Sequence, residues 1–305
     1  MKQPTIAFIG LGIMGRPMVG HLARAGYRLV AHTLEGVPQE LLAMGVSERP
    51  SAMDAAREAD IVILMLPDTP DVEAVLFGTL GVAEGAHRGT LVIDMSTISP
   101  VATRTFAQRL AVHGLRLMDA PVSGGEVGAK AASLTIMVGG SETDFALAKP
   151  LFEKMGKNVT LVGEVGAGQI TKAANQMIVA LNIATVAEAL SLAARMGADP
   201  ARVRQALMGG FASSRVLEVH GERMIKGTFE PGFRIRLHRK DLRIIAASAE
   251  AVNQAAPLTA VCQQLMNACA AMGAEDLDHS ALIKVYGALG AAAREQGAAA
   301  QRMAA

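Results

Sequence analysis

The chain has 305 residues, with 29 Lys and Arg against 28 Asp and Glu and a formal net charge of +1. This length exceeds that of a usual single domain, so two domains are expected, each large enough to bury a core. A hydrophobic share of 51% beside 19% charged residues is typical of a well-packed soluble protein. No long run of one charge sign occurs, which argues against nucleic-acid binding and against a membrane-surface role.

In the first half of the chain, residues 5–9 form a short apolar run, residues 15–25 suit a helix that ends at Gly26, and residues 27–31 suit a second strand. This is a βαβ unit. Further strands are expected at 61–66, 91–94, 116–118 and 134–138, with helices at 52–57 and 102–113. The alternation predicts an α/β Rossmann fold, with a doubly wound, mostly parallel sheet covered by helices on both faces.

The pattern changes near Gly163, after which no convincing strand is expected. Residues 169–196 read as one helix, about 42 Å long at 1.5 Å per residue. A membrane span is rejected because polar residues recur through this helix, at Lys172, Asn175, Gln176, Asn182, Glu188 and Arg195. A helix that is apolar nearly all round is better buried, as the spine of a second domain or as a subunit interface.

We therefore expect a Rossmann domain over residues 1–164, an all-α domain for substrate and oligomer contacts over residues 165–295, and a tail at 296–305. The two cysteines, Cys262 and Cys269, stand seven residues apart on an expected helix, which separates their Cα atoms by about 10 Å, beyond disulfide reach. They suit core thiols in a reducing compartment. The glycine-interrupted N-terminal run does not suit a signal peptide, so a cytoplasmic location is expected.

The strongest local motif is the glycine-rich turn Gly10-Leu11-Gly12-Ile13-Met14-Gly15, which follows an expected strand and opens an expected helix. In a GxGxxG turn the first glycine permits the bend, the second lets the backbone approach a pyrophosphate, and the third lets helix and strand pack. The diphosphate then lies on free amides at the positive end of the helix. The motif predicts dinucleotide binding.

The choice between NAD and NADP depends on the end of the second strand, where an acid that binds the ribose hydroxyls is expected about 20 residues after the motif. The chain there is Ala31-His32-Thr33-Leu34-Glu35. No Asp stands at the strand end, Glu35 comes late, and no Arg follows to bind a 2′-phosphate. His32 and Thr33 suit either cofactor. The pattern favours NADH and leaves NADPH open.

Two further segments are candidates for substrate chemistry. The loop Asp119–Gly125 follows a strand and contains Ser123-Gly124-Gly125, whose amides and hydroxyl suit a carboxylate, although an ordinary loop fits equally well. Lys172 stands in the expected first turn of the long helix, where the helix dipole disfavours a cation, so a functional role is favoured over a solvated one. Asn175 lies three residues on, on the same face. Lys240 and Asp241, taken alone, suit a solvated helix face.

Four segments in this order resemble the β-hydroxyacid dehydrogenase family, to which 3-hydroxyisobutyrate dehydrogenase belongs. They are the N-terminal run 8–18, the loop 119–125, the helix start 168–175 and Lys240-Asp241-Leu242. The resemblance covers nearly the whole chain. It implies a Rossmann domain, a long connecting helix and an all-α domain that makes subunit contacts, giving a homodimer or homotetramer.

The resemblance also implies roles for the matching positions. Lys172 would be the general acid/base, Asn175 would orient the substrate, and Ser123, Gly124 and Gly125 would bind its carboxylate. With Thr33 from the strand end, the expected contacts to NAD or NADP are Gly10, Leu11, Gly12, Ile13, Met14, Gly15, Thr33, Leu66, Pro67, Ser96, Thr97 and Lys240. No metal ligand is expected.

Within the family, residues 206–217 and 278–282 are most similar to members that reduce tartronate semialdehyde (2-hydroxy-3-oxopropanoate) to D-glycerate with NAD(P)H, in glyoxylate metabolism. The alternatives are a 3-hydroxyisobutyrate dehydrogenase or a succinic or glyoxylic semialdehyde reductase. Polar groups near 213–215 are expected to decide among these, because a substrate with extra hydroxyls needs polar partners. An inert cofactor-sensing member is disfavoured by the presence of Lys172.

Overall fold

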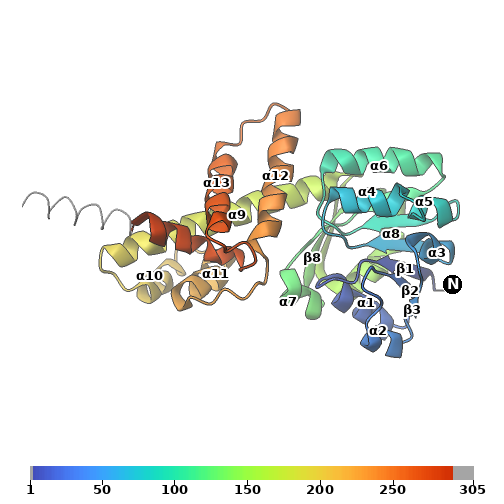
Figure 1. Ribbon diagram of the computed structural model, residues 1–305, viewed down its shortest axis with the longest axis horizontal. Helices are drawn as coiled ribbons and strands as arrows, with labels where there is room; N and C mark the ends of the chain where they lie inside the picture. The colour runs from blue at the N-terminus through green and yellow to red at the C-terminus, as the bar shows by residue number, and fades with distance from the viewer. Residues whose placement is uncertain (1–2, 291–305) are drawn as a thin grey trace, which may run out of the picture. The chain divides into compact units, whose positions relative to one another are not determined.

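The computed structural model describes residues 3–290 and divides into two compact units between Ala174 and Asn175 (Figure 1). The first is an α/β unit and the second is helical. The division falls inside helix α9 (Ala167–Arg195), so this helix contributes to both units. The domain limits expected at 164–165 and 295 stay predictions, and the tail expected at 296–305 lies outside the described residues.

The α/β unit contains one nine-stranded sheet in the order β3-β2-β1-β4-β5-β6-β8-β7, with β9 beside β8. Its first six positions have the strand order of a doubly wound nucleotide-binding fold, and all pairs among them are parallel. The strands are β1 (Thr5–Ile9), β2 (Arg28–His32), β3 (Ser47–Glu48), β4 (Ile61–Leu64), β5 (Leu91–Asp94), β6 (Arg116–Asp119), β7 (Val122–Ser123), β8 (Leu134–Gly139) and β9 (Gly156–Gly163).

The sheet is mixed at one edge, because β8 is antiparallel to β6 and β7 and parallel to β9. The sequence patterns missed β3, β7 and β9. Two of these contain only two residues each. The third, β9, has exposed or half-buried positions such as Lys157, Asn158 and Thr160 in place of an apolar run. It is recognisable only by its pairing with β8.

Helices cover both faces of the sheet, as Figure 1 shows with α1 and α2 on one side and α4, α5 and α6 on the other. Successive side chains of a strand point to opposite faces. Ile6 and Phe8 of β1 therefore join one buried core, while Ala7 and Ile9 join the other. The helices are α1 (Gly15–Arg24), α2 (Gln39–Ala43), α3 (Ala52–Arg57), α4 (Thr69–Phe77), α5 (Val82–Gly85), α6 (Pro100–Val112), α7 (Gly125–Lys130) and α8 (Glu142–Met155).

The helical unit continues from α9, and within residues 164–290 it contains no strand beyond one isolated bridge. Ser214 marks the start of α11, where its hydroxyl accepts a hydrogen bond from the Leu217 amide at 3.0 Å. Both cysteines lie buried and unpaired on α13. The elements are α10 (Pro200–Leu207), α11 (Arg215–Lys226), α12 (Ile235–Ala251), α13 (Pro257–Ala271) and the 3-10 helix η1 (His279–Leu282).

Helix α9 begins two residues before the expected start, at Ala167, which moves Lys172 into its second turn. The argument that the dipole disfavours a cation there is therefore wrong, because that effect fades beyond the first turn. Among the described helices, α9 alone is long and apolar enough to cross a membrane, with 33% of its most apolar stretch buried. Its buried stripe runs through Ala180, Ile183 and Ala187, while Ile178 is 61% exposed.

Candidate functional site

The glycine-rich turn leaves β1 with its second glycine open to solvent. A Cβ on Gly10 would meet the Met65 carbonyl oxygen at 2.3 Å, and one on Gly15 would meet the Gly10 carbonyl oxygen at 2.0 Å. A Cβ on Gly12 would meet nothing within 4 Å. Met14, which precedes helix α1, gives no side-chain cap that would compete with an anion. The Arg16 amide donates to the Gly12 carbonyl at 3.0 Å and Pro17 has no amide hydrogen, so an anion would bind at the turn itself. This turn fits a dinucleotide pyrophosphate.

A cavity of about 480 Å³ lies beside this turn. Glu35, which follows β2, and Glu40 of α2 contribute carboxylates to its wall, and Arg16 contributes a guanidinium. The complete lining is Leu11, Gly12, Ile13, Arg16, Pro17, Glu35, Glu40, Glu126 and Lys130. Thr33 follows the end of β2, and His32 turns its Nδ1 to the Arg49 carbonyl at 3.1 Å.

The loops after β4 and β5 are joined by a hydrogen bond. The Leu66 amide donates to the Ser96 hydroxyl at 2.9 Å, and the Ser96 amide donates to the Asp94 carboxylate at 3.0 Å. These strands are parallel neighbours, so their carboxyl ends meet at one edge of the sheet. The structure therefore brings the segments 66–67 and 96–97 together, as the expected cofactor path requires.

Two residues for which the sequence patterns predicted no role of their own hold the start of helix α9. The Asp119 carboxylate, at the end of β6, accepts hydrogen bonds from the amides of Gly166 at 2.6 Å and Gln169 at 2.7 Å. Burial raises the pKa of Asp119 to about 6, although these bonds act in the opposite direction. The Gln169 side chain donates to the Ser96 carbonyl at 2.8 Å and accepts from the Ile98 amide at 3.2 Å. The segment that carries Lys172 is thus fixed to the loop that carries Ser96.

Lys172 and the Ser-Gly-Gly turn both belong to the α/β unit. The Lys172 side chain is buried, with 5% relative exposure, so it does not lie on a solvated face. Ser123 ends the short strand β7, and Gly124 and Gly125 take φ angles of +132° and +60°, which L side chains rarely adopt. The angle at Gly124 is one that essentially only glycine adopts, and the angle at Gly125 favours glycine.

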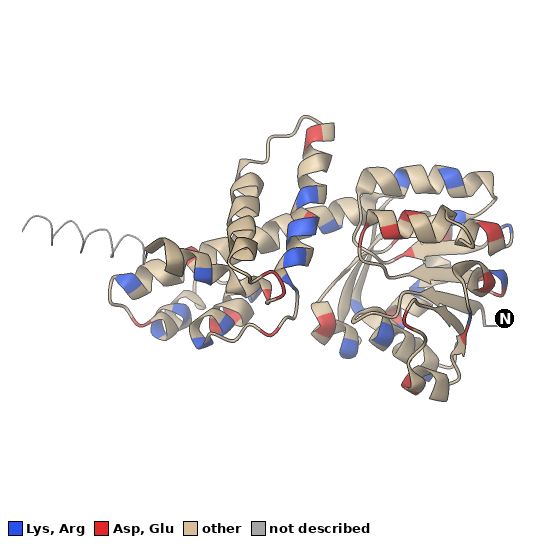
Figure 2. Ribbon diagram, in the orientation of Figure 1, with Lys and Arg blue, Asp and Glu red and all other residues tan. Residues whose placement is uncertain are grey.

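The helical unit holds the remaining predicted residues in a buried polar chain. Asn175 Nδ2 donates to Gln176 Oε1 at 2.8 Å, and Gln176 Nε2 donates to Asp241 Oδ2 at 2.5 Å. Lys240 Nζ lies 3.0 Å from Asp241 Oδ1 in an ion pair. Lys240 is 8% exposed and Asp241 2%, so the interpretation of this pair as a solvated face is wrong. Other cations do lie along α12, as Figure 2 shows.

One group of metal-type ligands occurs among residues 3–290, namely His220, Asp278 and His279, whose ligand atoms lie within 4.8 Å of one another. Both Asp278 oxygens already accept hydrogen bonds, from Ser280 on one side and from the amides of residues 232 and 233 on the other. Arg223 lies 3.0 Å from the same carboxylate. Burial lowers the pKa of His279 well below its usual value. We interpret the group as a hydrogen-bonded cluster that stabilises the fold rather than as a metal site.

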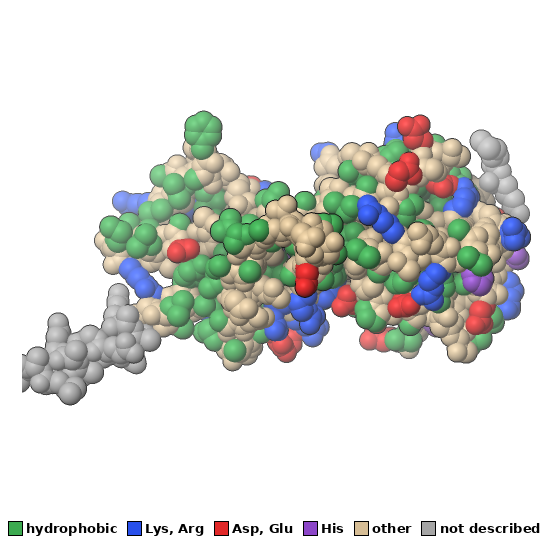
Figure 3. All heavy atoms as spheres, turned by 90° about the horizontal axis from the view of Figure 1, so that it is seen from above, with side chains coloured by type: hydrophobic (Ala, Val, Ile, Leu, Met, Phe, Trp, Pro, Cys, Tyr) green, Lys and Arg blue, Asp and Glu red, His purple; other side chains and the backbone are tan. Residues whose placement is uncertain are grey.

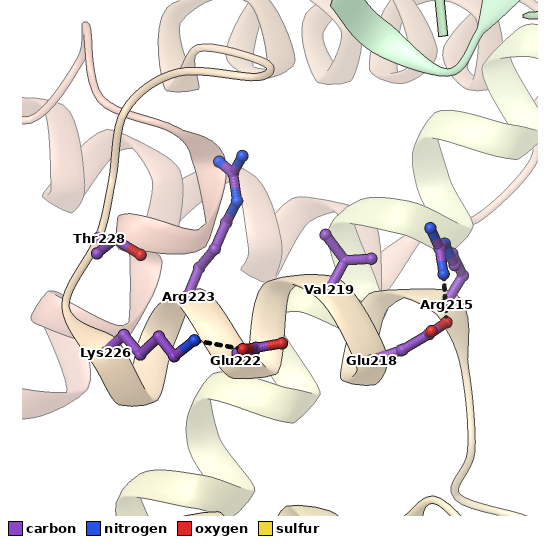
Figure 4. A pocket seen from close by; sticks show the side chains of 7 residues that line it. All are labelled: Arg215, Glu218, Val219, Glu222, Arg223, Lys226 and Thr228. Carbon is purple, nitrogen blue, oxygen red and sulfur yellow. Dashed lines mark hydrogen bonds and ion pairs between the residues drawn. The ribbon is translucent and has the colours of Figure 1, made fainter. Parts of the chain in front are cut away.

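A shallow depression of about 330 Å³ lies over α11 (Figure 4). Its exposed charges are paired along the helix, Arg215 with Glu218 and Lys226 with Glu222, both at 2.5 Å. The lining is Arg215, Glu218, Val219, Glu222, Arg223, Lys226 and Thr228. It contains none of the candidate residues, and its internal pairing leaves little net charge to attract a ligand.

A glycine turn that can bind a pyrophosphate, at the carboxyl edge of a doubly wound sheet, is typical of NAD(P)-binding dehydrogenases. Two family models match the chain, described as the NAD binding domain of 6-phosphogluconate dehydrogenase over residues 5–163 and the NAD-binding domain of NADP-dependent 3-hydroxyisobutyrate dehydrogenase over residues 166–286. The chain belongs to the β-hydroxyacid dehydrogenase family, and both the resemblance and the fold expected from the sequence are confirmed.

Among its relatives, 2-hydroxy-3-oxopropionate reductase of Escherichia coli is 56% identical, over 92% of this chain and 96% of the relative. The 3-hydroxyisobutyrate dehydrogenase of Pseudomonas aeruginosa is 36% identical, over 92% and 98%. A solved structure of the Mycobacterium tuberculosis 3-hydroxyisobutyrate dehydrogenase with L-serine superposes with a TM-score of 0.86 at 34% identity, covering 93% of this chain and 99% of that one.

Proposed function

We propose that the enzyme reduces tartronate semialdehyde to D-glycerate with NADH or NADPH. The observation that carries the proposal is the 56% identity, over nearly the whole of both chains, to a relative named for this reduction. The buried Lys172 and the open glycine turn, both in the α/β unit, are the features that such a reaction needs.

The cofactor would lie along the carboxyl edge of the sheet. The glycine turn at residues 10–15 would bind the pyrophosphate through amides beyond that of Gly10, which donates to the His32 carbonyl at 3.0 Å. Thr33 would bind the adenosine ribose, and the segments 66–67 and 96–97 would line the path toward the nicotinamide. The open space at Gly12 and the uncapped start of α1 support this placement. When bound, the dihydronicotinamide supplies the hydride that reduces the aldehyde.

We propose NADH as the preferred cofactor. Glu35 and Glu40 line the cavity beside the glycine turn, where a 2′-phosphate dianion would meet like charges. Arg16 lines the same cavity and would offset part of this repulsion, so the preference is expected to be partial. The ratio of kcat/KM for NADH to that for NADPH measures it, and Glu35→Gln should lower the ratio. A ratio below one in the unmodified enzyme would contradict the assignment.

In the proposed mechanism, the Ser123-Gly124-Gly125 turn holds the substrate carboxylate and Asn175 orients the substrate. Lys172 gives a proton to the carbonyl oxygen as that oxygen becomes an alkoxide. The burial of Lys172 suits this role, because water is kept away from the ammonium group and from the developing charge. Lys240 would close over the cofactor, at a position that its ion pair with Asp241 fixes.

The test is a panel of small aldehydes assayed with both cofactors. Loss of the carboxylate anchor should lower kcat/KM by at least about 10²-fold, or about 2.7 kcal/mol of transition-state binding. Tartronate semialdehyde should be the best substrate. If neutral glyceraldehyde were reduced as efficiently, the carboxylate site and the substrate assignment would both be abandoned.

The alternatives are a 3-hydroxyisobutyrate dehydrogenase and a succinic or glyoxylic semialdehyde reductase, and the Pseudomonas aeruginosa relative favours the first of them. The segment 213–215 is expected to discriminate. Ser214 caps α11 and Arg215 pairs with Glu218, whereas Ser213 is exposed, so Ser213 is the proposed partner of a substrate hydroxyl. The same panel separates these substrates. An enzyme inert toward every aldehyde would instead support a cofactor-sensing role.

We further propose a homodimer or homotetramer in the cytoplasm. Apolar side chains are exposed on the helical unit, where Figure 3 shows many of them on one face. Leu192, Met196, Val252, Leu258 and Val261 are each at least 59% exposed. Their burial between subunits would remove an apolar surface that isolated proteins rarely present. Light scattering that gave the single-chain mass of 31.7 kDa at micromolar concentration would contradict the assembly.

A further inference from the structure

Gln176 stands at the centre of the polar chain in the helical unit, and nothing in the sequence patterns pointed to it. We infer that Gln176 is a positioning residue, which fixes the orientation of Asn175 and the placement of Lys240 through Asp241. The inference rests on the roles proposed above for Asn175 and Lys240. Gln176 does not itself need to touch substrate or cofactor.

The hydrogen-bond chemistry of the chain permits only one orientation of the Gln176 amide. The Asp241 carboxylate, which pairs with Lys240 through Oδ1, accepts a hydrogen bond at Oδ2, so the group 2.5 Å from Oδ2 is the Gln176 NH2. The Gln176 carbonyl oxygen therefore faces Asn175, whose NH2 lies 2.8 Å away. This arrangement in turn fixes the Asn175 amide, and it keeps the Asn175 carbonyl oxygen as an acceptor for a substrate hydroxyl.

The main chain of Gln176 is held by the same helix that holds its side chain. His238 Nε2 lies 3.1 Å from the Gln176 carbonyl oxygen, which only accepts, so His238 carries its hydrogen on Nε2. His238 and Asp241 are three residues apart on α12 and hence on one face of it. Gln176 is 4% exposed and His238 is fully buried, so water does not compete for these bonds. Together they set how α9 and α12 pack within the helical unit.

The cluster has room for one negative charge. Asp241 supplies it, and Lys240 balances it from 3.0 Å. A glutamate in place of Gln176 would put a second carboxylate about 2.5 Å from Asp241 Oδ2, in a buried site where two such groups must share a proton. In this variant the two carboxylates should therefore repel each other at high pH. As the pH falls and one proton binds between them, the hydrogen-bonded arrangement should form again.

The test compares Gln176→Glu with the double variant Gln176→Glu/Asp241→Asn, which restores one carboxylate and one amide with their places exchanged. At pH 8 we expect the single variant to lose about 10- to 10²-fold in kcat/KM, the range of coupling between contacting buried groups. Its activity should rise relative to wild type as the pH falls toward 6. The double variant should recover at least about tenfold of the loss and should lack the added pH dependence.

Gln205→Glu serves as the matched control, because Gln205 is an exposed residue of α10 and the same charge change there should leave the kinetics unchanged. Circular dichroism checks folding. If Gln176→Glu does not fold, Gln176→Met keeps the volume, removes both side-chain bonds, and should lower kcat/KM without altering its pH dependence. Wild-type kinetics in that methionine variant would overturn the inference.

A Gln176→Glu pH profile parallel to that of wild type, or a double variant no better than the single one, would reduce Gln176 to a packing residue. These outcomes are distinct from a failure of the proposed function. If wild type does not reduce tartronate semialdehyde, the substrate assignment fails. The Gln176 comparison can still be made with whichever aldehyde the enzyme reduces.

Discussion

The two units hold their candidate residues by different means. In the α/β unit the fixing contacts use the backbone, as where Gly10 and Gly15 let main chains meet and where the Asp119 carboxylate binds the amides of Gly166 and Gln169. In the helical unit the fixing contacts run mainly between side chains, from Asn175 through Gln176 and Asp241 to Lys240. In the α/β unit, a side-chain atom added at a turn glycine should therefore be the change that disturbs the site. In the helical unit, a changed side-chain charge in the polar chain should do so.

The physical reason lies in where backbone groups are free. A parallel sheet releases its main-chain amides and carbonyls at the carboxyl ends of the strands, where turns and helix starts can use them. Helices satisfy nearly all of their backbone groups internally, so contacts between helices depend on side chains. The bond from His238 to the Gln176 carbonyl oxygen adds one contact to the backbone to the side-chain bonds that hold the candidate residues of the helical unit.

The largest expected effect is that of Lys172→Ala. Removal of a general acid typically costs about 10² to 10⁴ in turnover, and we expect a loss in this range at unchanged cofactor affinity. Steady-state kinetics and calorimetric titration with NADH measure the two quantities. Lys149→Ala on the exposed face of α8 is the control, since its side chain takes part only in a surface ion pair at 3.8 Å. Near-normal turnover in Lys172→Ala would contradict the assignment of Lys172 as the general acid.

The next largest effect is expected from substitutions at Gly12 and Gly15, which should have different consequences although both glycines belong to one turn. A Cβ at Gly12 meets no protein atom within 4 Å, so we expect Gly12→Val to fold yet to weaken NADH binding by at least about 10²-fold, or about 2.7 kcal/mol. Gly15→Val should instead fail to fold, because its Cβ would overlap the Gly10 carbonyl oxygen. Calorimetry and circular dichroism read the two outcomes. Unchanged affinity in Gly12→Val would show that the pyrophosphate binds elsewhere.

The sequence predicted elements well where local pattern and tertiary burial agree. The apolar runs 5–9 and 91–94 are strands with the expected bounds, and the glycine turn lies between β1 and α1 as its motif requires. The edge strand β9 escaped prediction because its exposed positions give no apolar run, and its pairing partner β8 alone identifies it. The tertiary pairing that defines an edge strand is not visible in a local window.

The residues that position the site escaped prediction for a related reason. Asp119 bonds to residues 47 and 50 positions away, and Gln176 bonds to a residue 65 positions away. No local spacing encodes such contacts. The burial of Lys240 and Asp241 was misread because a charged pair on a helix is usually solvated. Here the ion pair itself and the hydrogen bond from the distant Gln176 help to satisfy the buried carboxylate.

The smallest expected effect concerns how the free energy of unfolding depends on pH, through one buried group in each unit. The raised pKa of Asp119 means that the folded state holds a proton that the unfolded chain has released, so this group lowers stability as the pH rises from about 4 to about 6. His279 acts in the opposite direction. Its pKa is lowered by burial, so as the pH falls below about 6.5 the unfolded chain gains a proton that the folded state refuses, and stability falls.

Relative to wild type, Asp119→Asn should therefore gain stability as the pH rises through this range, and His279→Asn should gain it as the pH falls. Each difference can change by at most about 1.4 kcal/mol per pH unit, the limit for one proton. Urea denaturation followed by circular dichroism at half-unit pH steps measures both. If the stability differences of the two variants from wild type changed with pH in the same direction, the two buried groups would not titrate in the opposed ways described.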